Sequence, residues 1–283
     1  MSYTTLVDVA TLSAHADDPD WLIVDVRHQL SDTGYGERVY GEAHIPGAAF
    51  LHCDRDLSGP MTGSNGRHPL PDPEKLAARL GEIGVGPQTQ VVVYDDTQGM
   101  IASRLWLLLR WLGHDRVALL DGGLQAWQAA GQPLTSVLPT LRPANFVANE
   151  RDCLVDAGYV QKFLTTSQMH LVDARSADRF RGENETLDPV AGHIPGAVNR
   201  FFRDNLRADG CLKPAEELRA EWLAVLAGAP PERVVHMCGS GVSACLGMLA
   251  MEISGLSGPA AEKLSIALSV TTARDRIWRM ACS

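Results

Sequence analysis

The residues best suited to chemistry lie at the end of an apolar run, where one cysteine is followed by small residues. Residues 234–237 read Val-Val-His-Met, Cys238 follows, residues 239–241 read Gly-Ser-Gly, and residues 244–253 have helix-forming composition. This order predicts a strand, a tight loop and a helix. Backbone N–H groups of such a loop can point at the sulfur, and the positive end of the helix lies beneath it, so a thiolate is favoured. We therefore predict that Cys238 is a nucleophile, the alternative being a buried cysteine packed in a glycine-rich turn.

A cysteine loop between a strand and a helix is also typical of phosphatases. Their loops place an arginine six residues after the cysteine, where the planar guanidinium binds phosphate with two parallel hydrogen bonds. Here that position, counted from Cys238, is Ala244. Phosphoryl transfer is therefore disfavoured, and chemistry at sulfur is the better prediction.

Composition limits the partners of the chain. Its 283 residues suffice for one large or two medium domains. The formal charge of −9 argues against nucleic acid or an anionic membrane as a partner. Residues 1–16 lack the basic start and apolar core of a signal peptide, and no stretch is long and apolar enough to span a bilayer. Six cysteines without CxxC pairs fit neither a disulfide framework nor a zinc site, so we expect a cytoplasmic protein without a bound metal.

One structural unit is written twice along the chain. A buried-strand pattern ends in Asp25-Val-Arg27 and is followed by a His-Ile-Pro-Gly-Ala segment at His44. The same two landmarks recur at Asp173 and His193 with nearly the same spacing, which indicates an internal duplication. We expect each aspartate to pair with the arginine two residues later, and each histidine to hydrogen-bond the backbone of its tight turn.

Each half alternates strands with helices. Residues 91–94 and 234–237 read as equivalent buried strands, and residues 102–112 and 244–253 read as the helices that follow them. Such alternation implies a parallel sheet covered by helices, so we expect the α/β class in each half.

The two halves are expected to form two domains, only one of which has a nucleophile. Residues 1–134 form the first domain, residues 135–149 an extended linker that contains prolines, and residues 150–283 the second domain. Aligning the strands places Asp95 where the second half has Cys238. Because a carboxylate can neither accept a sulfur atom nor become a thiolate, only the second domain is predicted to be catalytic.

The paired D-x-R and G-x-x-HIPGA segments, with a C-G-S-G-V-S-A loop in the second half only, resemble the tandem-domain rhodanese-like sulfurtransferases. The resemblance covers residues 1 to about 258. It implies two rhodanese-like domains, the first inactive and the second catalytic. It also implies that Cys238 takes sulfur from a small-molecule donor as a persulfide and passes it to cyanide or a thiol, with thioredoxin among the candidate acceptors and with no cofactor.

The resemblance also bears on the donor. An uncharged cysteine loop is typical of the 3-mercaptopyruvate sulfurtransferases, whereas cationic loops suit dianionic thiosulfate. Ser243 stands where that subfamily has threonine, and it keeps the hydroxyl group. We therefore expect 3-mercaptopyruvate as the donor, with thiosulfate as the alternative. The loop residues expected to bind the substrate are Gly239, Gly241, Val242 and Ser243.

The same subfamily implies groups that handle the proton and the carboxylate of the substrate. Ser240, His68 and Asp56 match a serine, a histidine and an aspartate that are proposed to act together. An ordinary surface histidine is the alternative for His68, and Asp54 competes with Asp56 for its role. Arg179 matches an arginine that holds the substrate carboxylate.

One expected cation is missing. The subfamily has a second arginine shortly before the second His-Ile-Pro-Gly-Ala segment, and residues 183–188 contain none. Arg181 or Arg104 would have to substitute, although a solvated helix or loop charge is the better interpretation of each.

The C-terminal part of the chain departs from the family pattern. A glycine-serine-tryptophan segment is usual near the active site, and none occurs after about Pro259. We hypothesise a divergent or frame-shifted C-terminus that alters one strand of the second domain. This departure keeps open an alternative of a different class, a non-catalytic module that carries persulfide sulfur or binds a partner.

Overall fold

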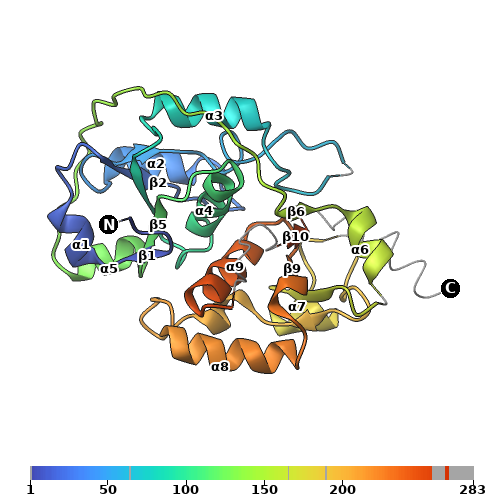
Figure 1. Cartoon of the computed structure of the whole chain (residues 1–283). Helices are drawn as coiled ribbons and strands as arrows, with labels where there is room; N and C mark the ends of the chain where they lie inside the picture. Colours follow the sequence, from blue (N-terminus) through green and yellow to red (C-terminus); the bar gives the residue numbers. More distant parts are fainter. Residues whose placement is uncertain (1, 64, 165, 189, 257–264, 268–283) are drawn as a thin grey trace. The chain divides into compact units, whose positions relative to one another are not determined.

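The structure is a computed structural model that describes residues 2–63, 65–164, 166–188, 190–256 and 265–267 (Figure 1). Backbone contacts divide these residues into two units. The first contains the described residues up to Gly59, Pro71–Arg151 and Ala208–Leu212. The second contains Pro60–Leu70, Asp152–Arg207 and the described residues from Lys213 onward. Each unit therefore includes a short segment that lies, in sequence, between parts of the other.

The first unit is built on a five-stranded sheet in the order β1-β5-β4-β2-β3, in which every pairing is parallel. The strands are β1 (Leu6–Val7), β2 (Trp21–Asp25), β3 (Ala49–Phe50), β4 (Gln90–Tyr94) and β5 (Val117–Leu120). Helices flank the sheet, as the parallel connections require. They are α1 (Val9–Ala14), α2 (Tyr35–Glu42), α3 (Pro73–Glu82), α4 (Ala102–Trp111) and α5 (Gly123–Ala129).

The second unit repeats this topology. Its sheet has the order β6-β10-β9-β7-β8, again with parallel pairings only. The strands are β6 (Leu154–Val155), β7 (His170–Asp173), β8 (Val198–Asn199), β9 (Val234–Met237) and β10 (Ser265–Ala267). The α-helices are α6 (Ala157–Phe163), α7 (Ala177–Arg181), α8 (Ala215–Leu226) and α9 (Ala244–Ile253), and two 3₁₀ turns, η1 (Phe202–Asn205) and η2 (Pro231–Arg233), precede α8 and β9. The α/β prediction for both halves is thus confirmed.

Strand β10 bears on the hypothesis of an altered C-terminus. It lies between β9 and β6, which is the place that β5 occupies between β4 and β1 in the first unit. The strand that the sequence pattern left in doubt is therefore formed. The other residues to which the hypothesis applies, 257–264 and 268–283, lie outside the described residues.

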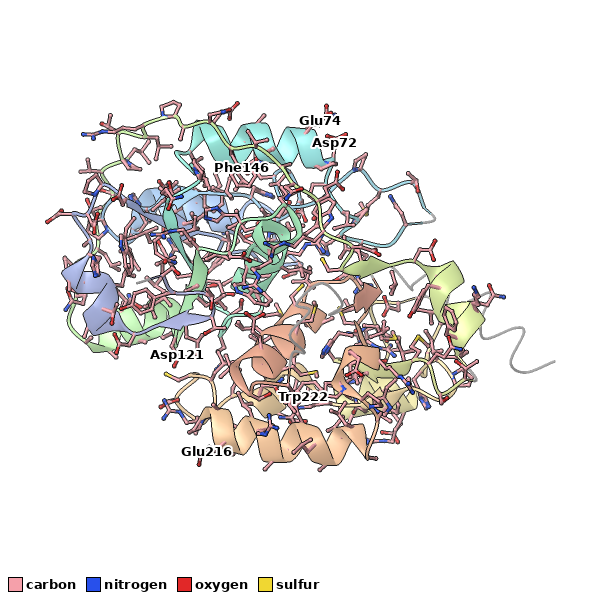
Figure 2. The ribbon with its side chains drawn as sticks, in the orientation of Figure 1. Asp72, Glu74, Asp121, Phe146, Glu216 and Trp222 are labelled. Carbon is pink, nitrogen blue, oxygen red and sulfur yellow. The ribbon has the colours of Figure 1, made fainter. Side chains whose placement is uncertain are left out.

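The central strands are buried along their whole length. All five residues of β4 and all four of β9 are buried, as expected for parallel strands covered on both faces. In the second unit Trp222 of α8, which is labelled in Figure 2, packs edge-on against His236 of β9 with ring centroids 5.4 Å apart. Burial lowers the pKa of His236 to about 3, so this imidazole is neutral. Among the described residues, no helix is long and apolar enough to cross a membrane.

Local sequence signals explain where several helices begin. Asp72 precedes α3 and its carboxylate accepts a hydrogen bond from the N–H of Lys75 at 3.0 Å, while Pro73 occupies the first helical position (Figure 2). Within the predicted linker, residues 135–149, Thr135 forms an isolated β-bridge with His44, and residues 136–149 include no helix or strand.

The D-x-R pairs connect each strand to the turn that follows it. Arg27 donates from Nε to Asp25 at 2.9 Å and from Nη2 to the carbonyl of Ala43 at 2.6 Å. Arg175 donates from Nη2 to Asp173 at 2.6 Å and to the carbonyl of Gly192 at 2.8 Å. The predicted pairing is thereby confirmed in both units, and each arginine also holds the segment before a His-Ile-Pro-Gly-Ala turn.

The histidines of these turns are structural, as predicted. His44 Nδ1 lies 2.7 Å from the carbonyl of Tyr40, and His193 Nδ1 lies 2.8 Å from that of Phe180. The ring of His193 also stacks on Phe180 with centroids 3.7 Å apart.

The buried pair of Asp25 and Arg27 offers a stability test. Their side chains are 0% and 5% exposed, so Arg27→Met leaves a buried carboxylate without its cation. We expect the free energy of unfolding to fall by about 3–5 kcal/mol, measured from urea denaturation. Arg38→Ala removes an exposed arginine that pairs with Asp32, and it should change stability by less than about 1 kcal/mol. Equal effects of the two substitutions would contradict the assignment.

Candidate active site

Cys238 lies where the sequence places it, directly after β9 and six residues before α9 begins. It is 2% exposed, and its Sγ accepts a hydrogen bond from the backbone N–H of Gly241 at 3.1 Å. Gly241 has a φ of 79°, in the left-handed region that favours glycine, so the loop can turn sharply enough to bring this N–H back onto the sulfur. The predicted strand, loop and helix are confirmed, and a backbone amide of the loop contacts the sulfur.

A second thiol contacts the same glycine. Cys245, on the first turn of α9, is fully buried and donates from Sγ to the carbonyl of Gly241 at 3.3 Å. The two thiols are therefore hydrogen-bonded to the N–H and to the carbonyl of the same glycine. This contact helps to fix the conformation of the loop.

The equivalent loop of the first unit shows what this scaffold binds. Asp95 follows β4, is fully buried, and its Oδ1 accepts N–H bonds from Thr97 at 3.0 Å and Gly99 at 2.8 Å. Its Oδ2 accepts N–H bonds from Ile101 at 2.8 Å and Ala102 at 2.9 Å. Four amides thus surround one carboxylate. The loop of the duplicated unit is a binding site for an anion, and the first unit fills it with its own side chain.

This carboxylate should be important for the stability of the first unit. Asp95→Asn removes the negative charge and replaces one carboxylate oxygen with an NH2 group. That NH2 group cannot accept hydrogen bonds from the backbone N–H groups that face it. We expect a loss of about 2–6 kcal/mol in the free energy of unfolding, because two of the four N–H groups lose their acceptor and each unsatisfied group costs about 1–3 kcal/mol. Urea denaturation measures the loss. A change within the error of the measurement would show that the amides do not depend on the charge.

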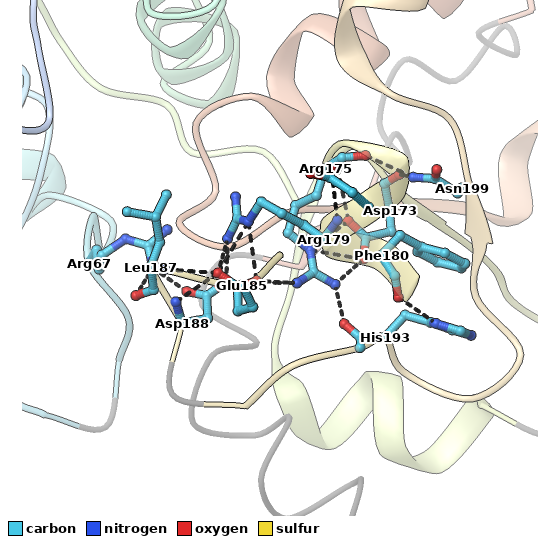
Figure 3. Close-up of polar contacts among 12 residues, drawn as sticks. Arg67, Asp173, Arg175, Arg179, Phe180, Glu185, Leu187, Asp188, His193 and Asn199 are labelled. Carbon is cyan, nitrogen blue, oxygen red and sulfur yellow. Dashed lines mark hydrogen bonds and ion pairs between the residues drawn. The ribbon is translucent and has the colours of Figure 1, made fainter. Parts of the chain in front are cut away.

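The residue after the nucleophile lies against an ion pair. A Cβ atom placed on Gly239 would be 2.7 Å from Nη2 of Arg67 and 2.7 Å from Oδ2 of Asp188. Arg67 and Asp188 are themselves paired, and Nη1 of Arg67 also donates to the carbonyl of Leu187 at 3.2 Å (Figure 3). All of these residues belong to the second unit. A side chain at position 239 would therefore displace the ends of both members of this pair.

Arg179, the predicted holder of the substrate carboxylate, is bound by carboxylates of its own unit. Its Nε lies 3.1 Å from Glu185, and its Nη2 lies 2.9 Å from both Glu185 and Asp188 (Figure 3). Arg175 also contacts Glu185, at 3.1 Å from Nη1. A substrate carboxylate would have to share Arg179 with these groups, so the predicted role of Arg179 in binding stays a prediction.

Glu185 is the acceptor at the centre of this network. Its side chain is 2% exposed and also accepts N–H bonds from Leu187 and Asp188 at 2.9 Å. Burial raises its pKa, but the hydrogen bonds from Arg179 and from the backbone outweigh that effect and lower the pKa to about 2.

This lowered pKa predicts how stability depends on pH. A carboxyl group whose pKa is lower in the folded state contributes stability above its ordinary pKa of 4.5, and loses it as the pH falls toward 2. Glu185→Gln should therefore be less stable than wild type at neutral pH, and the difference should shrink through this acidic range. Urea denaturation at a series of pH values measures both curves. A difference that stays constant with pH would contradict the assignment.

The remaining predicted residues divide between the units. Ser240 and Val242 are buried in the loop of the second unit, and Ser243 precedes α9 without a side-chain capping bond. His68, 4% exposed, belongs to the Pro60–Leu70 segment of the same unit, so it is not an ordinary surface histidine.

Asp56 belongs to the first unit and has local partners. Its carboxylate accepts the N–H of His52 at 2.6 Å and Nε of Arg79 at 3.2 Å. Its competitor Asp54 lies 3.7 Å from Nε2 of His28. These contacts close the turn after β3, and the proton-handling role of Asp56 stays a prediction.

The two arginines considered as substitutes for the missing cation have structural surroundings. Arg104 is fully buried in the first unit, where its Nη2 donates to the carbonyl of Leu57 at 3.2 Å, so its interpretation as a solvated charge was wrong. Arg181 is 54% exposed and pairs with Glu183 at 2.7 Å. The residue that the sequence argument did not consider is Arg67. The only available signal was its position next to His68 in a Gly-Arg-His-Pro segment.

Comparisons with known proteins agree with this geometry. The model of the rhodanese-like domain matches residues 8–130 and 156–259. The chain is 48% identical over 262 residues to a Pseudomonas aeruginosa protein named "Probable 3-mercaptopyruvate sulfurtransferase", and the match covers 92% of each chain. It is 38% identical over 220 residues to human 3-mercaptopyruvate sulfurtransferase, a match that covers 74% of this chain and 70% of the human one. The crystal structure of SseA from Escherichia coli, a 3-mercaptopyruvate sulfotransferase, superposes with a TM-score of 0.80 at 31% identity over 94% of this chain and 98% of SseA. With two copies of the matched domain and relatives at this level of identity, the chain belongs to the family of tandem rhodanese-like sulfurtransferases.

Proposed function

We propose that this protein is a sulfurtransferase that moves sulfur from 3-mercaptopyruvate through a persulfide on Cys238. The observation that carries the proposal is the hydrogen bond from the N–H of Gly241 to the Sγ of Cys238, in a loop whose duplicate surrounds a carboxylate with four amides. Such a site stabilises negative charge on sulfur both before and after transfer. The relatives named as 3-mercaptopyruvate sulfurtransferases support the choice of donor.

The first half-reaction forms a bond between two sulfur atoms. The Cys238 thiolate attacks the sulfur of the donor, the carbon–sulfur bond breaks, and its electron pair passes to carbon as the enolate of pyruvate. The thiol proton of the donor ends on that carbon, so the products are pyruvate and a persulfide anion. Ser240, His68 and Asp56 are the groups we propose for this proton transfer.

The second half-reaction returns the enzyme to its starting state. A nucleophile attacks the outer sulfur of the persulfide, the sulfur–sulfur bond breaks, and the Cys238 thiolate leaves. Cyanide gives thiocyanate, and a thiolate gives a new persulfide. No step requires a metal or an organic cofactor. Small thiols, cyanide and thioredoxin are the acceptors to compare.

Thiosulfate is the alternative donor at the same nucleophile. The loop residues 239–243 carry no charge, whereas thiosulfate is a dianion. We therefore expect kcat/KM for 3-mercaptopyruvate to exceed that for thiosulfate in a cyanolysis assay with both donors. A higher kcat/KM for thiosulfate would show that thiosulfate is the preferred donor.

The nucleophile itself is tested by substitution. Wild-type protein treated with 3-mercaptopyruvate should gain one sulfur atom on the peptide that contains Cys238, detected by mass spectrometry. Cys238→Ser should lose both this adduct and turnover, because serine cannot form a persulfide. Cys211→Ser, which changes a cysteine of the first unit, is the control and should keep both. Failure of wild-type protein to form an adduct with either donor would favour a non-catalytic module.

A further inference from the structure

The guanidinium of Arg67 lies beside the loop that carries the nucleophile. Its Nη2 would be 2.7 Å from a Cβ on Gly239, the residue that follows Cys238 in the chain. The side chain is held there by two contacts of Nη1, one with the carbonyl of Leu187 and one with the carboxylate of Asp188 (Figure 3). The guanidinium of Arg67 and the carboxylate of Asp188, which would be equally close to that Cβ, are therefore both fixed within a few ångströms of the backbone of the nucleophile loop.

Arg67 is partly exposed, and one of its nitrogen atoms has no hydrogen-bond partner among the described residues. Its side chain is 28% exposed, while that of its partner Asp188 is 1% exposed. Its Nε is buried and has no hydrogen-bond partner among the described residues. A buried donor without an acceptor destabilises the folded state, so its presence here calls for an explanation.

In the two neighbouring arginines the corresponding nitrogens have partners. Arg175 holds Asp173 through Nε and Nη2, and Arg179 holds Glu185 through the same two atoms. Their side chains are 1% and 18% exposed. The Nε–Nη2 edge is the one that an arginine uses to bind a carboxylate with two parallel bonds. In Arg67 that edge includes the unpartnered Nε.

We propose that Arg67 binds the carboxylate of the sulfur donor and so determines the preference for a 2-oxo acid thiol. The inference rests on the proposed function, because the carboxylate of 3-mercaptopyruvate is separated from the attacked sulfur by only two carbon atoms. Because Gly239 follows Cys238 in the chain, a cation beside Gly239 can hold one end of the donor while Cys238 attacks the other. Arginine suits this role because its planar fork matches the two carboxylate oxygens.

Steady-state kinetics test the proposal with a graded pair of variants. Arg67→Ala should raise the KM for 3-mercaptopyruvate at least tenfold and change kcat less than about threefold, because it removes binding that is the same in the ground and transition states. Arg67→Lys keeps the charge but not the fork, so its KM should be intermediate. Arg233→Ala is the matched control, since this exposed arginine of the same unit also donates from Nη1 to a backbone carbonyl, that of Ser167 at 2.9 Å.

A second measurement needs no turnover. Alkylation of Cys238 by iodoacetate, which carries a carboxylate, is compared with alkylation by neutral iodoacetamide, both followed by the mass of the peptide that contains Cys238. The ratio of the two rates should fall at least fivefold in Arg67→Ala and stay at the wild-type value in Arg233→Ala. Because the ratio cancels any change in the thiol itself, a purely structural effect of the substitution would leave it unchanged.

The two measurements separate the inference from the proposed function. If wild-type protein does not turn over 3-mercaptopyruvate, the proposed function fails, while the alkylation ratio still reports whether Arg67 attracts carboxylates to Cys238. If wild-type protein is active, an unchanged KM in Arg67→Ala overturns the inference alone. A loss confined to kcat and melting temperature, with the alkylation ratio unchanged, also overturns it.

Discussion

Both units depend on one constraint: the backbone amides at the turn between the central strand and the next helix must have an acceptor. Backbone N–H groups that are taken out of water need another acceptor. In the first unit the carboxylate of Asp95 accepts four such bonds, three from the turn before α4 and one from Ala102, the first residue of α4. In the second unit the sulfur of Cys238 accepts a bond from Gly241. The same physical requirement is met by a structural anion in one copy and by a reactive atom in the other.

A second constraint acts on the segment before the second His-Ile-Pro-Gly-Ala turn. Three carboxylates and three arginines are collected there, and most of these side chains are almost completely buried. They are Asp173, Glu185, Asp188, Arg67, Arg175 and Arg179. Buried charges are tolerated when they are paired and hydrogen-bonded, and removing one partner is costly. The acidic residues that stand where a further arginine was expected therefore organise the arginines that are present.

The fold could be predicted because its signals are local. The valine runs of β4 and β9, the glycines after Cys238 and the acidic start of α3 each act within a few residues, and the structure has these elements at or near the expected positions. The D-x-R pairs are also local, with partners two residues apart, and this explains why they could be predicted in both halves.

The surroundings of the nucleophile could be predicted only in part. Arg67 and Asp188 are 121 residues apart, and no sequence pattern near either residue predicts that they form an ion pair. The ion pair between Arg179 and Glu185 could not be predicted either. An arginine that binds a substrate and one that binds a neighbouring glutamate look the same in a sequence. The strand β10 was missed as a strand for another reason. It has only three residues, and no glycine follows it in the sequence, whereas Gly122 and Gly123 follow its counterpart β5.

The assignment of Pro60–Leu70 to the second unit has a consequence for how this duplicated protein can change over generations. A gene fragment that encoded only the C-terminal half would supply Cys238 but not the residue that lies on Gly239, since Arg67 is encoded in the other half. The second unit therefore depends on a segment that is encoded in the N-terminal half. Recombination that exchanged one half for a distant homologue would separate the two members of an ion pair, so the halves are constrained to diverge together.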